Sequence, residues 1–400
     1  MLFLGGSIQQ IPAIQYAKEQ GYFTVLCDYY DDSPAQIYSD EFFCISTTDK
    51  ESILKVAISS NINGIVAYAS DPAAATAAFV GNQLNLPSNL YQSVKILSEK
   101  DLFRKFLHEH GFNSPNSIQV IGVEEAKAKI RGFTFPLMVK PTDSSGSKGI
   151  TRIDSIEQIQ EAVEIAMSNS RNNKVIIEEF IEMGHDYLIG GDIFVLNGKI
   201  RFTGYLNCHR NTSINPLVPI GKSYPVLIDN EKIELITEEL QKVMDLLHIK
   251  SGAFNIEVMF DQNGNLYIIE IGPRNGGNFI PQLLRLITGV DLVRATVEAA
   301  LDNQTLDLQY SPPSDAYYST YILHTEKEGV LKEIVFLDAI KKYLVNKTIY
   351  KQPGEQVEKF TQANKAIGIL FLKFSNRDEM IHIMKGMGQY IDIRLEDDFG

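Results

Sequence analysis

Short apolar runs alternate with amphipathic segments along the first hundred residues. An apolar run at Leu2–Leu4 precedes an amphipathic segment from about residue 8 to residue 20, and the apolar runs YFTVLCD and GIVAYASDP follow at 22–28 and 64–72. Because short apolar runs of this kind are typical of buried strands and amphipathic segments of helices, the alternation predicts a parallel sheet flanked by helices. The fold class expected for this part of the chain is therefore α/β.

Small and polar residues follow the strands of this predicted sheet. Ligands bind beyond the carboxyl ends of the strands in such sheets, so these residues would share one edge. They are Gly5, Gly6, Ser7, Asp28, Ser70 and Asp71. We take Gly6, Ser7 and Asp71 as substrate candidates. The turn LGGS also suits close packing of a strand against a helix, and it lacks the GxGxxG pattern of dinucleotide-binding folds.

A predicted helix at 99–110 is followed by a strand that ends in a lysine. Ser98 and Asp101 have the spacing of a capping box at the start of this helix, and the apolar run FPLMVK then carries Lys140. In the loop DSSGSKGI at 143–150, small residues would let backbone N–H groups approach phosphate oxygens. A plain hairpin turn is the alternative, because the lysine precedes the loop and the pattern GxxxxGK[ST] is absent.

The segment KVIIEEFIEMGHDYL predicts a strand that leads into a hinge between two lobes. Lys174–Ile177 is rich in β-branched residues, and Glu178–Ile181 continues this run. Exposed backbone donors and acceptors at such a hinge suit the edge of an adenine ring, and Asp186 suits the hydroxyls of a ribose. The alternative is an ordinary strand end at the surface.

Two strand-like runs flank Asn263-Gly264, which is the strongest short signal for a β-hairpin. If these two residues form a type I′ turn, counting outward along both runs places Glu257 opposite Glu270. The Cβ atoms would then be roughly 5 Å apart, where like charges destabilise the pair. A divalent cation would neutralise both acids, and Mg²⁺ favours carboxylates together with substrate phosphates. A shared proton, or ion pairs to Arg274 and a lysine, are the alternatives.

The same register sorts the hairpin into two faces. One face is nearly all apolar and contains Phe254, Ile256, Val258, Phe260, Tyr267, Ile269 and Ile271. The other face carries the two acids together with Asn255, Met259, Ile268 and Gly272. This alternation supports the register.

Composition and charge narrow the classes of function. A chain of 400 residues is longer than one hydrophobic core usually supports, so two or three lobes are expected. A formal net charge of -13 argues against a nucleic-acid partner. The apolar runs are too short for a membrane, and Cys27, Cys44 and Cys208 suit neither a disulfide framework nor a zinc site. We expect a cytoplasmic protein without nucleic-acid or membrane partners, and leave a homodimer open.

Five segments together resemble an ATP-grasp enzyme in order and spacing. They are SEKDLFRKFL with Lys100, FPLMVKP with Lys140, the loop SSGSKG, the hinge EEFIEMGHD, and the acid pair of NIEVMF and EIGPR. The resemblance covers about residues 1–310 and is greatest to the branch of biotin carboxylase, carbamoyl phosphate synthetase and phosphoribosylglycinamide synthetase. It implies a pre-ATP-grasp domain at 1–95 and an ATP-grasp domain at 96–310, with a lid at about 113–182. A small α/β lobe is expected at 311–400.

The resemblance implies roles for individual residues. Lys100 and Lys140 would contact the phosphates of ATP, and the loop would close over them with Ser144, Ser145, Gly146, Ser147 and Gly149. Adenine would lie against Glu178, Glu179, Phe180 and Ile181, and Asp186 would bind the ribose. Glu257 and Glu270 would hold Mg²⁺, or Mn²⁺ in its place. Many relatives have Asn where this chain has Gly272, so Asn275 is taken as the third metal ligand.

The resemblance also implies a mechanism. A substrate carboxylate attacks the γ-phosphate of ATP to give an acylphosphate, and an amine then displaces phosphate. Lys140 and Arg274 are the candidate catalytic residues, because the planar fork of an arginine suits bidentate binding of a carboxylate or phosphate.

Three functions are weighed. The principal expectation is a carboxylate–amine ligase acting on a small metabolite. The alternatives are a bicarbonate-activating carboxylase or carbamoyl-phosphate-type enzyme, and a nucleotide-binding module without catalysis. Retention of both lysines and both acids favours an enzyme over the module.

The polar segment Gly204–Pro225 lies between strand-like flanks and is too mixed in chemistry for a simple connector. We assign it to the substrate side of the site, with His209, Arg210 and Lys222 as candidates.

Overall fold

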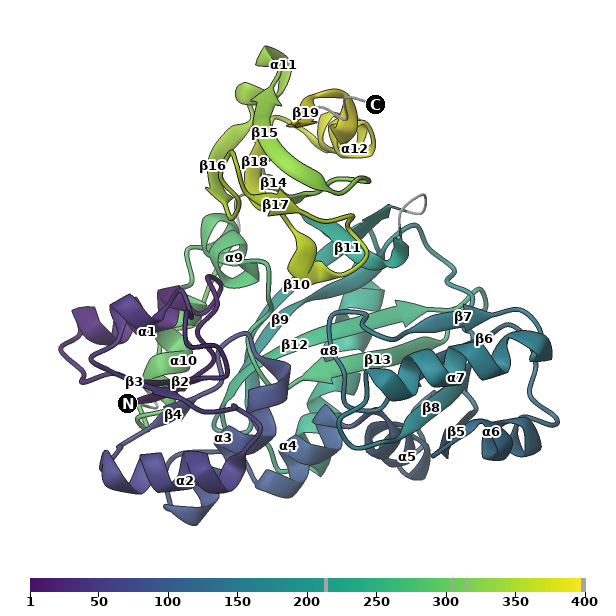
Figure 1. The fold of residues 1–400 in the computed structure, drawn as a ribbon, viewed down its shortest axis with the longest axis horizontal. Coiled ribbons are helices and arrows are strands. Elements are labelled where there is room, and N and C mark those ends of the chain that lie inside the picture. Colours follow the sequence, from purple (N-terminus) through teal and green to yellow (C-terminus); the bar gives the residue numbers. More distant parts are fainter. Residues whose placement is uncertain (212–214, 304, 312, 314, 397–400) are drawn as a thin grey trace.

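The computed structural model describes residues 1–211, 215–303, 305–311, 313 and 315–396. Three lobes surround a central sheet (Figure 1). The amino-terminal lobe is purple in this view, the lid lobe that follows it is blue, and the carboxy-terminal lobe is yellow-green. Helices and sheets occur throughout, so the expected α/β class is confirmed.

The amino-terminal lobe is a four-stranded parallel sheet with strand order β3-β2-β1-β4. This confirms the parallel sheet predicted from the alternation of apolar runs. Its elements are β1 (Leu2–Leu4), α1 (Ile11–Glu19), β2 (Val25–Asp28), β3 (Glu41–Cys44), α2 (Lys50–Ser59), β4 (Ile65–Val66) and α3 (Asp71–Gln83). Helix α10 (Leu292–Ala299), from much later in the chain, contacts this lobe. Tyr16 on α1 donates a hydrogen bond to Glu298 on this helix at 2.9 Å.

The lid lobe is a four-stranded antiparallel sheet with strand order β5-β8-β6-β7. Two helices, α4 and α5, connect it to the first lobe (Figure 1). Its elements, with these helices, are α4 (Tyr91–Ser98), α5 (Lys100–Glu109), β5 (Ser117–Val120), α6 (Val123–Lys129), β6 (Leu137–Pro141), β7 (Thr151–Ile153), α7 (Ile159–Ser168) and β8 (Val175–Glu179).

The capping box predicted at the start of α5 is wrong. Glu99 is the residue that precedes the helix, and its side chain makes no capping hydrogen bond. Ser98 instead ends the previous helix, where its hydroxyl donates to the carbonyl of Val94 at 2.8 Å. The first amide of α5, that of Lys100, donates to the carbonyl of Thr142 at 2.9 Å, so a neighbouring strand end replaces the cap.

The central sheet has eight strands in the order β13-β12-β9-β10-β11-β14-β18-β16. Its strands and the helices that cover it are β9 (Leu188–Leu196), β10 (Lys199–Asn211), β11 (Asn215–Tyr224), α8 (Asn230–Leu246), β12 (Gly252–Phe260), β13 (Leu266–Gly272), α9 (Ile280–Thr288), α10 (Leu292–Ala299), β14 (Tyr317–Leu323), β16 (Leu344–Ile349) and β18 (Gly368–Phe374). Part of the segment expected on the substrate side, residues 212–214, lies outside the described residues.

The last ninety residues continue this sheet. β14 pairs with β11, so three strands of the carboxy-terminal lobe extend the sheet that carries the hairpin acids. The remaining elements are β15 (Gly329–Phe336), α11 (Asp338–Lys341), β17 (Gln356–Val357), α12 (Arg377–Lys385) and β19 (Ile391–Leu395).

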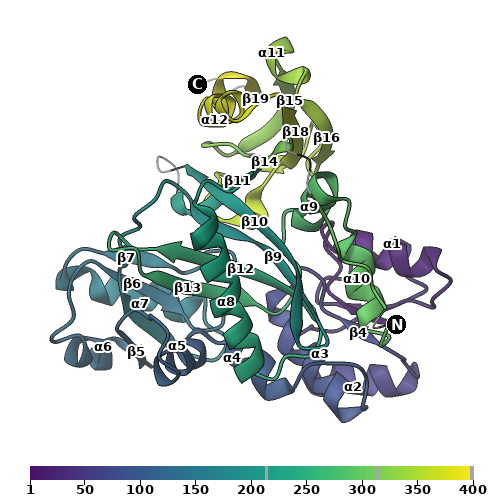
Figure 2. The same ribbon diagram turned by 180° about the vertical axis from the view of Figure 1, so that it is seen from behind.

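Two apolar clusters lie on opposite faces of the central sheet. On one face α8 packs through Leu240 and Val243 against Phe254 and other strand residues, and Figure 2 shows this helix crossing the sheet. On the other face α9 packs through Leu283 against Phe194 and its neighbours. Among the described residues, helices long and apolar enough to cross a membrane are absent.

The hairpin of β12 and β13 has the predicted pairing of its two acids, but its loop and its register differ from the prediction. Glu257 is the register partner of Glu270, which confirms the prediction. The two-residue turn is wrong, however, because Phe260 pairs with Leu266 and Asp261 closes a longer loop to Asn265. A bulge beyond the loop then inserts one extra residue into β13 and restores the expected pairing of the acids.

The bulge also corrects the predicted faces. Ile268 packs in the core beneath α8, whereas Ile269 lines a cavity on the opposite face together with Met259. The prediction had exchanged these two isoleucines. One inserted residue reverses the facing of the side chains on one side of it, because strand side chains alternate with a period of two.

At Gly191, strands β9 and β10 lie too close together for a side chain. It has φ +127, and a Cβ built on it would lie 1.9 Å from the carbonyl oxygen of Gly204. We expect Gly191→Ala to lower the free energy of unfolding by about 3 kcal/mol or more, because two strands at the centre of the sheet must separate. Urea denaturation followed by circular dichroism measures the loss.

Gly264→Ala is the matched control. Gly264 also has positive φ, at +83, but nothing lies within 4 Å of its Cβ position. Its cost should be only the backbone strain of about 1–2 kcal/mol. Equal losses in the two variants would contradict the steric explanation.

Candidate active site

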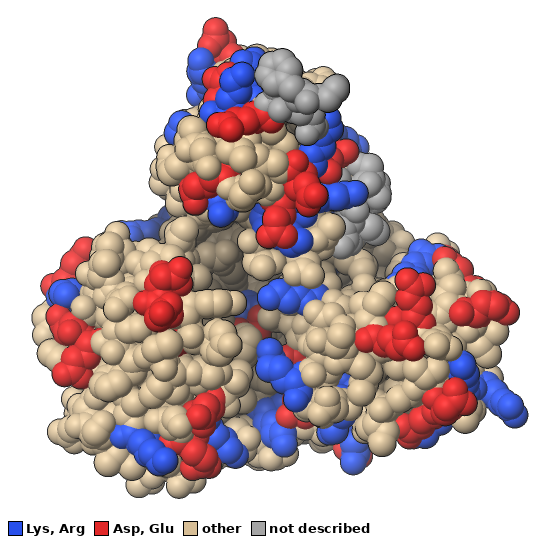
Figure 3. Space-filling view, viewed as in Figure 1, with Lys and Arg blue, Asp and Glu red and all other residues tan. Residues whose placement is uncertain are grey.

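A cavity of about 560 Å³ lies where the three lobes meet. Figure 3 shows this hollow in the face of the molecule, with Lys and Arg side chains around it. The cavity is lined by the loop after β6, the hinge after β8, the hairpin acids, and residues of the amino-terminal lobe.

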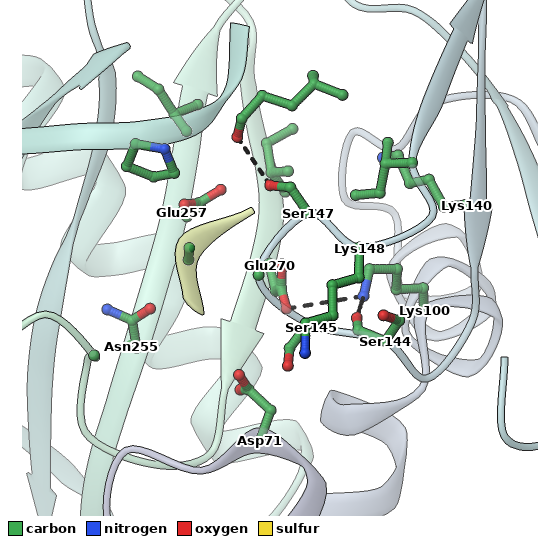
Figure 4. Close-up of a pocket in the computed structure, with 18 of the residues that line it drawn as sticks. Asp71, Lys100, Lys140, Ser144, Ser145, Ser147, Lys148, Asn255, Glu257 and Glu270 are labelled. Atoms are coloured by element: carbon green, nitrogen blue, oxygen red, sulfur yellow. Dashed lines mark hydrogen bonds and ion pairs between the residues drawn. The ribbon is translucent and has the colours of Figure 1, made fainter. Parts of the chain in front are cut away.

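The two hairpin acids face this cavity from adjacent strands. Glu257 and Glu270 point into the same space in Figure 4, with Lys100 and Lys140 on the side of the lid. Lys100 Nζ lies 4.0 Å from Glu270, and Arg210 Nη2 lies 3.8 Å from Glu257. These long pairs are weak in partly exposed positions, so a stronger ligand can replace them.

The donor set fits a hard divalent cation. Within the part of the chain that the structure describes, no group of three or more His, Cys, Asp or Glu side chains is arranged around a metal position. Two carboxylates on adjacent strands match the preference of Mg²⁺ for one or two carboxylates together with phosphate and water oxygens.

Asn275 does not belong to this set, which corrects its assignment as the third ligand. Its side chain is completely buried, and its Oδ1 accepts a hydrogen bond from Thr296 at 2.9 Å. It lines a different cavity, behind the loop that follows β13. Asn255 does line the main cavity, two residues before Glu257 on the same face. The alternation that located Glu257 could have identified Asn255 as well.

Glu178 lines the cavity, but its carboxylate is bound to other side chains of the protein. Glu178 is 2% exposed, and its carboxylate lies 2.8 Å from Arg104 Nε and 2.5 Å from Lys140 Nζ. Burial favours the neutral acid, but the charges of Arg104 and Lys140 outweigh it and lower the pKa of Glu178 to about 2. Glu178 therefore positions Lys140.

Sequence reasoning missed Arg104, although an arginine beside Phe103, Phe106 and Leu107 on the buried face of α5 was a signal. Its Nη2 also donates to the carbonyl of Ile269 at 2.8 Å, in the bulge of β13. Arg104 thus connects the lid lobe to the strand that carries Glu270.

Glu179, Phe180 and Ile181 of the hinge also line the cavity. The amides of Glu179 and Phe180 donate to the carbonyls of Asn116 and Pro136 at 2.9 and 3.0 Å. The Glu179 carboxylate accepts from the amide of Thr134 at 2.8 Å. Ile181 follows at the cavity wall.

The loop after β6 reaches across the cavity. Ser144, Ser145, Gly146 and Ser147 line it, whereas Gly149 packs against Pro141 and Asn169 outside it. The Ser147 hydroxyl donates to the carbonyl of Leu217 on β11 at 2.9 Å, and Lys100 Nζ donates to the carbonyl of Ser144 at 2.7 Å. The loop therefore connects the lid lobe to the central sheet.

Asp186 and His209 are placed in a neighbouring cavity of about 690 Å³, which corrects their expected places. His209 is buried, and its Nε2 lies 2.8 Å from the Ser223 hydroxyl. Burial, with the charge of Lys222, lowers the pKa of His209 to about 4. Arg210 lines both cavities.

The amino-terminal candidates divide in the same way. Ser7 and Asp71 line the main cavity. Gly6 does not, because its amide donates to the carboxylate of Asp28 and a Cβ there would lie 2.0 Å from the Ser33 hydroxyl. Close packing therefore explains this glycine, and its place among the substrate candidates is corrected.

The guanidinium of Arg274 binds Asp71. The sequence had predicted that it would bind a substrate carboxylate or phosphate. Its Nε and Nη2 lie 2.6 and 2.7 Å from the two carboxylate oxygens, and its Nη1 donates to the carbonyl of Asn275 at 3.1 Å. Burial opposes ionisation of Asp71, but the guanidinium outweighs it and lowers the pKa of Asp71. This pair joins the amino-terminal lobe to the loop after β13, the strand that carries Glu270.

Asp192 holds the loop that follows β13. It is completely buried, and its oxygens accept from the amide of Gly276 at 2.8 and 2.9 Å and from Asn255 Nδ2 at 2.9 Å. Burial raises the pKa of Asp192 to about 6, although these hydrogen bonds oppose the shift.

Residues 133–282 match the family described as "ATP-grasp domain". Residues 133–282 of this chain are therefore an ATP-grasp domain. Over 297 residues it is 23% identical to the carbamoyl phosphate synthase large chain of Thermoanaerobacter pseudethanolicus, which covers 73% of this chain. The chain spans about a quarter (24%) of that relative's length.

Two solved structures resemble the whole fold. The L-amino acid ligase from Bacillus licheniformis has a TM-score of 0.82 and 17% identity, covering 99% of this chain and 98% of its own. The phosphoribosylglycinamide synthetase from Anaerococcus prevotii has a TM-score of 0.76 and 22% identity, covering 99% of both chains. At these identities the likeness shows a shared fold.

The Arg104–Glu178–Lys140 network predicts a large stability loss when its arginine is removed. Arg104→Met leaves a fully buried carboxylate with one partner instead of two. Removing one partner of a buried ion pair costs about 3–5 kcal/mol. Urea denaturation should show this loss.

Arg285→Met is the control, because Arg285 pairs with Asp291 at 2.8 Å but its side chain is 64% exposed. It should lose about 1 kcal/mol or less. Equal losses would show that the buried network does not stabilise the lid.

Asp192 predicts a pH dependence of stability. Its folded pKa of about 6 lies above the usual value of 3.8, so its contribution is present below pH 4 and is lost as the pH rises through 6. The stability of the wild type relative to Asp192→Asn should therefore fall by up to about 3 kcal/mol between pH 4 and pH 7. Denaturation across this range measures it.

The control is Asp229→Asn, whose parent side chain is 83% exposed. Its difference from the wild type should stay constant between pH 4 and pH 7. A constant difference for Asp192→Asn as well would contradict the raised pKa.

Proposed function

We propose that this protein is an ATP-dependent ligase that activates a small carboxylic acid as an acylphosphate and couples it to an amine. The observation that carries the proposal is the cavity in which two facing carboxylates, Glu257 and Glu270, lie opposite two lysines, Lys100 and Lys140. ATP-grasp enzymes use ATP and Mg²⁺, and this set of charges suits both.

The nucleotide would lie between the lid lobe and the central sheet. Lys100 and Lys140 approach from the lid and would bind the phosphates as point charges. Backbone groups of the hinge, beside Glu179 and Ile181, would bind the adenine edge. Ser144–Ser147 would cover the phosphates, and the hydrogen bond from Ser147 to Leu217 supports closure of this loop across the cavity.

Glu257 and Glu270 would hold Mg²⁺, or Mn²⁺ in its place, and the cation would neutralise charge on the phosphate oxygens. The cation would take the place of Lys100 and Arg210, which form long ion pairs with these acids.

The reaction itself is a pair of displacements. A carboxylate oxygen of the acid bonds to the γ-phosphorus, and the bond from that phosphorus to the bridging oxygen breaks to release ADP. The amine then bonds to the carbonyl carbon of the acylphosphate, and phosphate leaves with the carbon–oxygen bonding pair while the amine loses a proton. The protein contributes position and charge, as phosphoryl transfer requires. Exclusion of water by the loop protects the acylphosphate.

The cellular setting completes the proposal. Small-molecule substrates fit the cavity, and a cytoplasmic location is supported by the free thiols of Cys27, Cys44 and Cys208. A homodimer, left open by the sequence, is decided by analytical ultracentrifugation.

Release of ADP tests the proposal directly. The wild type is screened with ATP and Mg²⁺ against amino acids and small carboxylic acids, with an amine acceptor present, and with bicarbonate as a separate arm. We expect one class of organic acid to stimulate ADP release. Glu257→Gln and Glu270→Gln should each reduce this rate by about 100-fold or more, because the cation that would neutralise the reacting phosphate loses a charged ligand.

Glu234→Gln, on the exposed side of α8, is the control and should retain full activity. Near-normal turnover by Glu257→Gln at saturating Mg²⁺ would contradict the metal site. Stimulation by bicarbonate alone would identify the carboxylase-type reaction. No stimulation by any acid would favour a nucleotide-binding module.

A further inference from the structure

A second cavity, of about 690 Å³, lies between the central sheet and the carboxy-terminal lobe. Its lining comes from the hinge before β9, the end of β10, the segment after β14, and α12 with the residues that follow this helix. Cavities of this size are typical of small-molecule sites. The proposed function makes no use of this second cavity.

The central sheet separates most of the second cavity from the metal-site acids. On β10, Cys208 pairs with Lys222, and the Lys222 side chain lines the main cavity. The next residue, His209, lines the second cavity and pairs with Gly221, whose partner on β14 is Tyr321. Because side chains alternate between the two faces of a strand, a ligand in the second cavity would lie on the opposite face of the sheet from the reacting phosphate.

The inner wall of the second cavity is apolar. Tyr321, Met384, Met387 and Ile391 line it and are each at most 9% exposed. Aromatic rings and flexible thioethers pack well against apolar groups of different shapes. The interior therefore suits an aliphatic or aromatic side chain.

The mouth of the second cavity is charged, with two residues of each sign among its described lining. Arg210 and Lys385 are positive, and Asp186 and Glu326 are negative. Lys385, Asp186 and Glu326 are exposed, and in the described part of the chain these three side chains take part in no ion pair. A ligand that carries both a positive and a negative group would match this arrangement.

The two histidines of the lining add no charge at neutral pH. Burial, together with the charges of Lys222 and Lys385, lowers the pKa of His209 to about 4. Burial also lowers the pKa of His324. The charge at the mouth is therefore set by the two acidic and two basic residues.

We propose that the second cavity binds a free amino acid with an aliphatic or aromatic side chain. Its carboxylate would bind Arg210 and Lys385, its ammonium would bind Asp186 and Glu326, and its side chain would lie against the apolar inner wall. A free amino acid matches these features because it carries both charges on one carbon atom, next to the apolar group.

Arg210 connects this site to the main cavity. It lines both cavities, and its guanidinium lies 3.8 Å from Glu257. A carboxylate bound in the second cavity competes with Glu257 for this guanidinium, so Glu257 becomes more available to Mg²⁺. The amino acid would therefore be an effector that favours binding of the magnesium nucleotide. This coupling rests on the proposed function, because it takes Glu257 as a metal ligand.

Calorimetric titration of the full chain with L-phenylalanine and L-leucine tests the site. Both should bind to the wild type, and L-serine, which lacks an apolar side chain, should bind more weakly. 3-Phenylpropanoate lacks the ammonium and 2-phenylethylamine lacks the carboxylate, so each should bind about ten-fold more weakly than L-phenylalanine. The inference is overturned if neither L-phenylalanine nor L-leucine binds, if L-serine binds equally well, or if the three phenyl compounds bind equally.

Lys385→Met tests the place of the carboxylate. It should weaken binding of L-phenylalanine about five- to ten-fold, because a charged contact at the mouth of a cavity is lost. Lys385→Arg keeps the charge and should retain most of the affinity, and 2-phenylethylamine should bind equally to all three proteins. Equal affinity of the wild type and Lys385→Met for L-phenylalanine would place the amino acid elsewhere, the main cavity included, and overturn the inference.

Lys341→Met is the matched control. Lys341 lies on α11 of the same lobe, its side chain is 58% exposed, and it pairs with Asp338 at 2.8 Å. Its replacement should leave the affinity for L-phenylalanine unchanged. A loss equal to that of Lys385→Met would show a general effect of charge on this lobe and would overturn the assignment of Lys385.

The affinity for MgADP, measured with and without saturating L-phenylalanine, tests the coupling. It should rise about two- to five-fold with the amino acid, as expected from one partly exposed ion pair. The affinity for ADP without Mg²⁺ should not change. Equal affinities for MgADP would overturn the effector role. If the chain binds no nucleotide, the proposed function fails, while the titrations with amino acids still decide the second site.

Discussion

The repulsion between Glu257 and Glu270 is the constraint on which the rest of the site depends. Two carboxylates on register-paired residues destabilise a sheet unless positive charge approaches them. Lys100 and Arg210 supply that charge at 4.0 and 3.8 Å, which is the limit of an ion pair. Such contacts are worth little in partly exposed positions, so the acid pair is stabilised only loosely. A loosely stabilised pair of acids is suited to receive a divalent cation together with the phosphates that accompany it.

Two other sets of charges in the cavity are held much more firmly, and they fix the arrangement of the lobes. Glu178 is buried between Arg104 and Lys140, and Arg104 continues to the bulge of β13. Asp71 binds Arg274 through two hydrogen bonds between the first lobe and the central sheet. The cavity therefore contains buried pairs that fix geometry and longer pairs that can be exchanged for a ligand. Phosphoryl transfer needs both, because the charges must be in place before the reaction and yet be available to the substrate.

In the hairpin of β12 and β13, the sequence pattern predicted the correct pairing of the two acids from an incorrect turn length. The signal of Asn263-Gly264 located the turn but not its length, and the extra residue in β13 compensated at Glu257 and Glu270. For Ile268 and Ile269 the two errors do not cancel, and each residue lies on the face of the sheet opposite to the one predicted. Arg104 donates a hydrogen bond to the carbonyl of Ile269 within this bulge, from a helix 165 residues earlier in the chain. A pattern read within the hairpin carries no information about such a partner.

The sequence by itself determined the parallel amino-terminal sheet, the lysine near the end of β6 and the acid pair, because each depends on periodicity or spacing over a few residues. Only the tertiary structure decided which charges meet. Asp71 and Arg274 are separated by 203 positions, and Glu178 and Lys140 by 38. An isolated arginine or glutamate suits a ligand and a protein partner equally well. The choice is made when packing buries it beside an opposite charge, since a buried charge must be paired wherever the fold places it.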